Sequence, residues 1–135
     1  MIELLAPAGD FDRLRTAVHF GADAVYVGGK KFSLRAGAGG VDDEELPLAV
    51  RYCHSNGRKL YVAVNIFAGD DDMDAMPEYL EKIYLSGADA VIVSDPGIIS
   101  VARKYTPNLE LHLSTQANTT NSYSAAFWAD MGVKR

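Results

Sequence analysis

Residues 21–28 read GADAVYVG, and residues 87–94 repeat this stretch as GADAVIVS. In each copy an amphipathic run ends at a glycine, Gly21 or Gly87, and a short run rich in valine and isoleucine follows. Glycine favours the left-handed backbone position that closes a helix. A continuous valine and isoleucine run is typical of a strand that is buried on both faces. The repeat therefore predicts a helix followed by a buried strand at each place.

The same kind of junction recurs at Gly57 and at Gly132. Repeated alternation of strands and helices indicates a parallel sheet with the helices packed outside it. The expected strands are residues 2–6, 24–28, 59–65, 90–93 and 110–113. The helices are expected to begin near Asp10, Asp42 or Asp43, Asp74 and Asp95, with a last helix that carries Ala125, Trp128 and Met131.

The spacing of these junctions indicates how large the complete sheet would be. Gly21 and Gly132 lie 111 positions apart and enclose four repeat intervals. At about 28 residues per unit, eight units need roughly 220 residues, close to the ~250 of a typical (β/α) barrel. We therefore expect an α/β fold in which residues 1–135 form one partial domain, the N-terminal portion of a TIM-like barrel with five βα units. Residues 133–135 would begin a sixth strand, and an open doubly wound sheet is the alternative.

Composition excludes several classes of protein. Of the 135 residues 48% are hydrophobic and 23% are charged, which is enough apolar material for a core and rules out a disordered chain. A net charge of −5 argues against general nucleic-acid binding, which requires an excess of cations. The single cysteine, Cys53, fits a reducing compartment. Without a signal peptide or a membrane-spanning stretch, we expect a cytoplasmic protein with no membrane partner.

Polar side chains gather where the expected strands end. Ligands of parallel α/β folds bind at the carboxyl ends of the strands, and alternate residues of a strand share one face. One such face is mixed and polar, whereas the other is aliphatic and must face the helices. This arrangement indicates a ligand pocket, although a satisfied polar core cluster is the alternative. The mixed face collects Glu3, Leu5, Tyr26, Gly28, Tyr61, Ala63, Asn65, Ile92, Ser94, His112, Ser114 and Gln116.

The loop at residues 29–40 is long for a connection between a strand and a helix, and long loops of this kind are often functional. It carries Lys30, Lys31 and Arg35 in an otherwise acidic chain. Arg35 could hold a carboxylate or a phosphate through two parallel hydrogen bonds, or it is a surface residue on a glycine-rich loop. The glycines do not have the spacing of a dinucleotide-binding motif.

His112 alternates with Ser114 on one strand face and is the candidate general base, because a neutral imidazole titrates near working pH. A hydrogen-bonded core histidine is the alternative. Cys53 is expected to be a small buried hydrophobe in the middle of a helix. The three histidines lack the spacing of metal ligands, so no metal site and no cofactor is expected in this chain.

Four segments together resemble the start of the collagenase-like peptidases, the unassigned peptidase family thirty-two. They are residues 3–10, 21–29, 32–36 and 112–118. The resemblance implies a TIM-like barrel in a protein of several hundred residues, cut short here before the cysteine-rich region of the family. The resemblance also implies that an iron–sulfur cluster belongs to the full-length protein and not to this chain. The pocket candidates that it carries over are Pro7, Gly9, Arg35, Asn65, His112, Ser114 and Gln116.

Despite the family name, the resemblance implies an oxygen-independent hydroxylation enzyme that modifies tRNA or rRNA, or that serves ubiquinone synthesis. The RNA branches use a carboxylate cosubstrate such as prephenate. We expect this chain alone to be inactive, and RNA binding only in the full-length parent. A true endopeptidase and a non-catalytic α/β binding or assembly domain are the alternatives. Five parallel strands leave two free edges, so we also expect a homo-oligomer that buries Leu5, Tyr26, Tyr61, Ala63 and Ile92.

Overall fold

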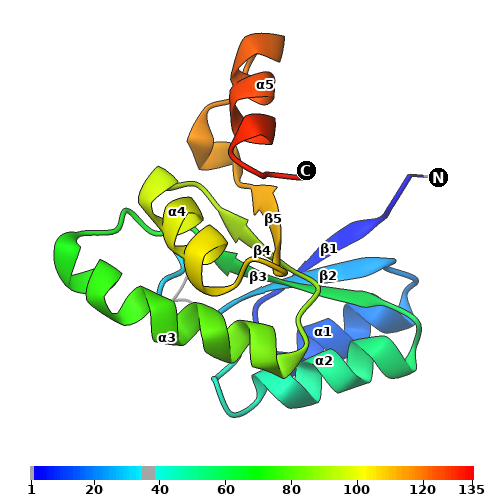
Figure 1. Cartoon of the computed structure of the whole chain (residues 1–135). Coiled ribbons are helices and arrows are strands. Elements are labelled where there is room, and N and C mark those ends of the chain that lie inside the picture. Colours follow the sequence, from blue (N-terminus) through cyan, green and yellow to red (C-terminus); the bar gives the residue numbers. More distant parts are fainter. Residues whose placement is uncertain (1, 35–38) are drawn as a thin grey trace.

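The computed structural model describes residues 2–34 and 39–135. Within this part of the chain, strands and α-helices alternate as the repeat predicts (Figure 1). The strands are β1 (Leu5–Ala8), β2 (Ala24–Gly28), β3 (Lys59–Val64), β4 (Ala90–Val93) and β5 (Glu110–Leu113). The helices are α1 (Phe11–His19), α2 (Leu46–Ser55), α3 (Asp70–Ser86), α4 (Pro96–Tyr105) and α5 (Ser122–Asp130), with a 3-10 turn, η2 (Thr115–Ala117), after β5.

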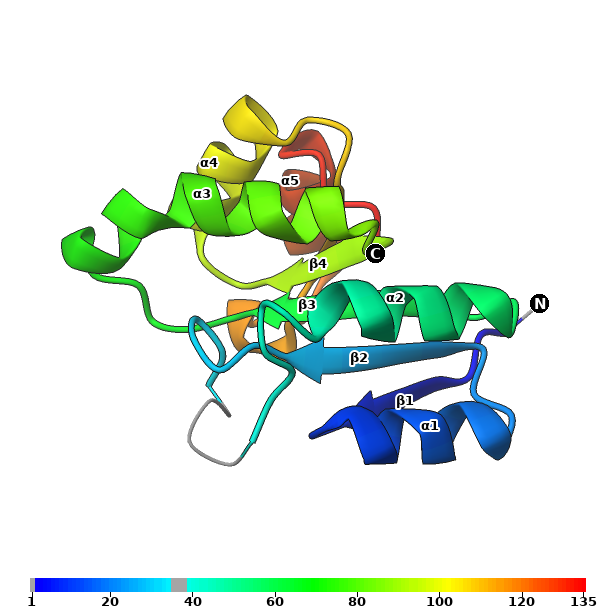
Figure 2. The ribbon, with the colours of Figure 1, turned by 90° about the horizontal axis from the view of Figure 1, so that it is seen from below.

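The strand order decides between the two expected architectures. All neighbouring strands are parallel and follow the order β1-β2-β3-β4-β5. A doubly wound sheet reverses its strand order at one point, and this sheet has no such point. Helices α1 to α4 lie on the same side of the sheet (Figure 2). The fold is therefore the first part of a (β/α) barrel, and the doubly wound alternative is excluded.

The beginning of a sixth strand follows β5. The Lys134 N–H donates to the Leu111 carbonyl at 2.8 Å, and the Leu113 N–H donates to the Arg135 carbonyl at 2.6 Å. Val133 is buried at the start of this segment. These contacts confirm the expectation that residues 133–135 pair beside β5, so that edge of the sheet is partly covered.

The outward face of the sheet forms the main core beneath the helices. Its side chains are the aliphatic set that the strand pattern predicts, and each full burial of this kind contributes about 1.5–3 kcal/mol. Leu14 of α1, Leu80 and Ile83 of α3 and Ile98 of α4 pack onto them. Cys53 is fully buried in α2, as expected. The buried strand residues of this face are Val25, Val27, Leu60, Val62, Val64, Val91, Val93 and Leu111.

The inward face is more covered than expected. Tyr61 and Ala63 are only 2% and 7% exposed within the single chain, so these two residues do not need a second copy to bury them, contrary to expectation. The ring of His112 packs edge-on against Tyr61 with centroids 4.6 Å apart, and the Glu3 carboxylate accepts from the Tyr61 hydroxyl at 3.0 Å. Leu5 keeps 36% of its surface exposed.

Several element boundaries differ from the expected ones. Helix α2 starts at Leu46 and not near Asp42 or Asp43, and β1 ends at Ala8 and not at residue 6. The first strand starts at Leu5, because the Leu4 N–H donates to the Asp23 side chain before regular pairing begins. Leu4 is therefore 58% exposed and does not face a helix, contrary to expectation. Helix α3 starts at Asp70, because the Gly69 N–H donates to the Asp72 carboxylate at 2.9 Å and acidic side chains are stabilised in a first helical turn.

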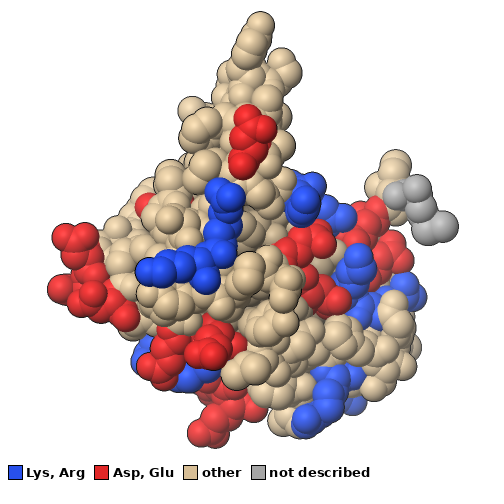
Figure 3. Space-filling model, in the orientation of Figure 1, with Lys and Arg blue, Asp and Glu red and all other residues tan. Residues whose placement is uncertain are grey.

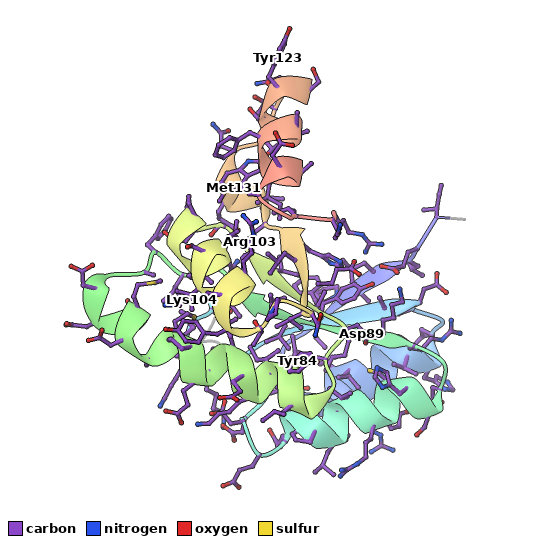
Figure 4. All side chains as sticks on the ribbon, viewed as in Figure 1. Tyr84, Asp89, Arg103, Lys104, Tyr123 and Met131 are labelled. Carbon is purple, nitrogen blue, oxygen red and sulfur yellow. The ribbon has the colours of Figure 1, made fainter. Side chains whose placement is uncertain are left out.

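Helix α5 stands apart from the rest of the molecule (Figure 1). Tyr123 lies at its far tip, whereas Met131 lies at its base beside Arg103 of α4 (Figure 4). Trp128 and Met131 pack partly against the core, but Tyr123 is 88% exposed and α5 has no buried residue. Across residues 2–34 and 39–135, no helix is long and apolar enough to cross a membrane.

Candidate functional site

The carboxyl ends of the strands open into a cavity of about 620 Å³. Its floor is made by the inward-facing strand residues Leu5, Tyr26, Ala63 and Ile92, and its rim is polar. This is the end of the sheet at which (β/α) barrels hold their ligands. Among the predicted site residues, those that the structure brings together here are Pro7, Gly9, Asn65, Ser114 and Gln116.

Three polar side chains of the rim form one hydrogen-bonded network. The Leu34 N–H donates to Asn65 Oδ1 at 3.3 Å, and Asn65 Nδ2 donates to Gln116 Oε1 at 3.2 Å. The Ser114 hydroxyl also donates to Gln116 Oε1. Asn65 follows β3, and Ser114 follows β5 at the start of η2, so the parallel strands themselves bring these residues to one edge.

Arg13 supplies a positive charge that the sequence analysis missed. Its guanidinium lies at the rim, 3.1 Å from an Asp10 carboxylate oxygen, and its side chain is 69% exposed. Gly9 leaves room for it, since a Cβ there would lie 3.0 Å from Arg13 Nη1. The spacing of Asp10 and Arg13 across the first turn of a helix was the available signal, because residues three apart are neighbours on a helix surface.

The loop after β2 closes one side of the cavity. Arg35 lies outside the described residues, but Leu34 and Gly39 on either side of residues 35–38 both line the cavity. Gly40 must be glycine for this path, because a Cβ there would lie 2.8 Å from the Gly28 carbonyl oxygen. The Lys30 ammonium turns away and pairs with Asp42. Lys30 therefore does not contribute a free positive charge to the predicted cluster of Lys30, Lys31 and Arg35.

His112 is separated from the cavity. It lies beneath the floor, where its side chain is 5% exposed and its Nε2 lies 2.8 Å from Glu110 Oε1. Its Nδ1 is buried without a hydrogen-bond partner among the described residues. Burial raises the pKa of the neighbouring Tyr61 to about 12, with the Glu3 carboxylate adding to the effect. The ring of His112 does not line the cavity. A general-base role for this residue therefore stays a prediction.

Comparison with known proteins identifies the family. The model of peptidase family U32 matches residues 9–135. The chain belongs to peptidase family U32. The solved structure of the U32 peptidase Mk0906 matches this fold with a TM-score of 0.77 at 16% identity, covering 98% of this chain and 56% of that one. The family is therefore the one that the sequence motifs resemble, and the structural likeness shows the shared fold.

Several curated relatives of this chain carry names from RNA modification, whereas one, of Methanocaldococcus jannaschii and 40% identical over 129 residues, is named an uncharacterized protease. The tRNA hydroxylation protein P1 of Bacillus subtilis is 42% identical over 133 residues, which are 98% of this chain and 32% of that protein. The 23S rRNA 5-hydroxycytidine synthase of Escherichia coli is 36% identical over 131 residues, which are 97% of this chain and 19% of that protein. This chain thus spans about a third or less of the length of these relatives.

The residues of this chain do not fit an iron–sulfur cluster. The only thiol in the sequence is Cys53, which is fully buried between α2 and the sheet. Burial raises the pKa of this thiol to about 11, with a smaller effect of Asp89, so it is not the thiolate that such clusters need. Among the described residues, no three His, Cys, Asp or Glu side chains form a metal-binding group.

Proposed function

We propose that this chain is the N-terminal part of a longer family U32 enzyme that hydroxylates a nucleobase in RNA. The names of the relatives support this proposal, since both name the hydroxylation of an RNA. The higher identity to the tRNA protein favours tRNA as the substrate. Such an enzyme works in the cytoplasm. Because this chain has a net charge of −5, we assign most of the RNA contacts to the rest of the protein.

The charge of the cavity is the observation on which we base the role of this chain within the enzyme. The chain is acidic, yet the described lining contains no carboxylate and one guanidinium, that of Arg13, which is paired from outside the cavity with the Asp10 carboxylate 3.1 Å away. Side-chain amides and a hydroxyl from Asn65, Gln116 and Ser114 surround the same space. A site of this kind suits an anion, and we propose that it binds a small carboxylate cosubstrate such as prephenate. Pro7 and Gly9 shape the rim.

We propose Arg35 as a second anchor for this carboxylate. An arginine holds a carboxylate through two parallel hydrogen bonds, which a lysine cannot reproduce. In the full-length protein, Arg35→Lys should weaken prephenate binding about ten-fold by calorimetry. Arg15→Lys is the matched control, because Arg15 is an exposed residue of α1 that does not line the cavity. An unchanged dissociation constant for Arg35→Lys would exclude Arg35 as an anchor.

The hydroxylation itself is tested in cells. A strain that lacks the gene should lose a hydroxylated nucleoside from its tRNA, measured by mass spectrometry of digested tRNA. The wild-type protein should restore the nucleoside, and Arg35→Lys should restore less of it at equal expression. If the nucleosides of tRNA and of rRNA are both unaltered in the deletion strain, RNA hydroxylation is not the function.

An endopeptidase is the second candidate, because of the family name. Such an enzyme needs a nucleophile with a positioned base, or an activated water. The Ser114 hydroxyl donates to Gln116, and His112 pairs with Glu110, so the described residues contain no hydrogen-bonded serine and histidine pair. The geometry therefore favours the RNA-modifying enzyme over a peptidase with a serine nucleophile.

A further inference from the structure

We propose that Gln116 is a specificity-determining residue of the cavity, and that Asn65 holds it so that only N–H donors face the ligand. This inference rests on the proposed function, which supplies the carboxylate ligand. It concerns the direction of each hydrogen bond in the network at the rim. That direction follows from one group whose role cannot change, the backbone N–H of Leu34.

A backbone N–H can only donate, and that of Leu34 lies 3.3 Å from Asn65 Oδ1. Asn65 must therefore keep its oxygen toward Leu34 and its NH₂ group on the other side. That NH₂ group lies 3.2 Å from Gln116 Oε1. Gln116 must in turn keep its oxygen toward Asn65, because two NH₂ groups cannot form a hydrogen bond with each other. The orientation of both amides is thus set from the backbone outward.

Ser114 completes this arrangement from the other side. Its hydroxyl donates to the same oxygen of Gln116, so both lone-pair positions of Oε1 are occupied. The two N–H groups of Gln116 Nε2 make no hydrogen bond with the described residues, and Gln116 is exposed at the rim. The amide therefore offers donors alone to an incoming molecule. A freely rotating glutamine would offer either its oxygen or its nitrogen.

A donor-only group selects ligand oxygens that accept, such as those of a carboxylate, and disfavours amines, whose N–H groups it would leave unpaired. Arg13 across the rim makes the same selection by charge. Asn65 is thus a positioning residue that acts through Gln116.

Variants of equal size test this inference by calorimetry with prephenate on the full-length protein. Gln116→Met keeps the length of the side chain but removes the donors, and it should weaken binding about ten-fold. Asn65→Asp still accepts from Leu34 but presents an oxygen to Gln116. Gln116 must then turn its nitrogen inward and its oxygen toward the ligand, so binding should again fall about ten-fold. Asn108→Asp, which adds the same charge to an exposed residue outside the cavity, is the control.

A double variant separates reorientation from simple charge repulsion. If Asn65 acts through Gln116, Asn65→Asp should weaken binding far less when Gln116 is already methionine. Equal weakening in both backgrounds would overturn the role of Asn65, and wild-type affinity in Gln116→Met would overturn that of Gln116, while the proposed function would stand in both cases.

If the wild type itself does not bind a dicarboxylate, the proposed ligand is wrong. The hydrogen bond between Asn65 and Gln116 is then tested by a second measurement, the stability of the variants. The unfolding free energies of the two single variants and the double variant should then be non-additive, because the two amides are in direct contact. Additive values would overturn the network as well.

Discussion

Arg135 reaches across the inside of the sheet to Glu3, 132 positions earlier, and its Nη1 lies 2.5 Å from Glu3 Oε1. Glu3 precedes β1 and Arg135 pairs beside β5, so the contact joins the two ends of an open sheet. The same guanidinium lies 5.7 Å from the centre of the Tyr61 ring, and the Tyr61 hydroxyl donates to Glu3. These three side chains together cover part of the inward face of the sheet.

This contact makes stability depend on pH. The hydrogen bond from Arg135 is the main reason why the pKa of Glu3 lies below its ordinary value of 4.5, although partial burial opposes the shift. A carboxyl whose pKa is lowered by folding stabilises the folded state above its unfolded pKa and loses this effect as the pH falls through its folded pKa. Glu3→Gln should therefore lower the unfolding free energy by about 0.5–1 kcal/mol at pH 7 and by less below pH 4.

Urea unfolding at several pH values measures this difference. Glu81→Gln is the matched control, because Glu81 is exposed on α3 and makes no ion pair with the described residues. The control should leave stability nearly unchanged at each pH. If Glu3→Gln destabilised the protein equally at pH 3 and at pH 7, the contact with Arg135 would not be the cause.

Cys53 should react slowly with iodoacetamide in the folded protein. The thiolate is the reactive form, and burial raises the pKa of Cys53 from 9.0 to about 11. Labelling, followed by mass spectrometry, should therefore stay slow as the pH rises from 7 to 9 and become rapid once denaturant unfolds the chain. Rapid labelling of the folded protein at pH 8 would contradict the buried position of this thiol.

The repeated GADAV stretch predicts the junctions between α1 and β2 and between α3 and β4, but it does not reveal what its aspartate contacts. Asp23 accepts a hydrogen bond from the Leu4 N–H at 2.9 Å, and Asp89 accepts one from the Leu60 N–H at 2.8 Å. In both copies the aspartate thus fixes the backbone at the start of the neighbouring strand. The partners lie 19 and 29 positions earlier, and a local pattern does not contain contacts of that range.

The candidate site, too, was predicted only in part from the sequence. Strand alternation predicted that Asn65, Ser114 and Gln116 meet at one edge, because a parallel sheet brings the ends of its strands together. The same alternation also selected His112, which shares their face. His112 lies two residues before Ser114 along β5, further from the cavity, and packs against Tyr61. Depth along a strand depends on the stagger between strands, which a single sequence does not reveal.

The purified protein should not cleave gelatin or casein. His112 is the candidate base, yet its Nε2 contacts Glu110 and its ring is buried against Tyr61. Zymography at neutral pH with a known collagenase as the positive control measures this activity. Reproducible cleavage that is lost in a folded His112→Ala variant, checked by circular dichroism, would restore the peptidase as the function.

Self-association of the 135-residue chain stays a prediction, but the structure changes the surface that carries it. Tyr61 and Ala63 are buried and cannot form the interface that the sequence suggested. Helix α5 is instead nearly uncharged on the face shown in Figure 3. Its Tyr123 and Phe127 are 88% and 55% exposed. Leu4, which directly precedes the edge strand β1, is 58% exposed.

Apolar side chains gathered on a projecting helix are a surface that soluble monomers seldom expose. We therefore expect a second copy to cover α5, and light scattering should give about twice the chain mass of 14.6 kDa. Replacing Tyr123 and Phe127 with serine should shift the chain to monomer. Phe67→Ser, at an 83% exposed residue before α3, is the control and should not. A folded wild-type monomer at micromolar concentration would show that α5 needs no second copy to cover it.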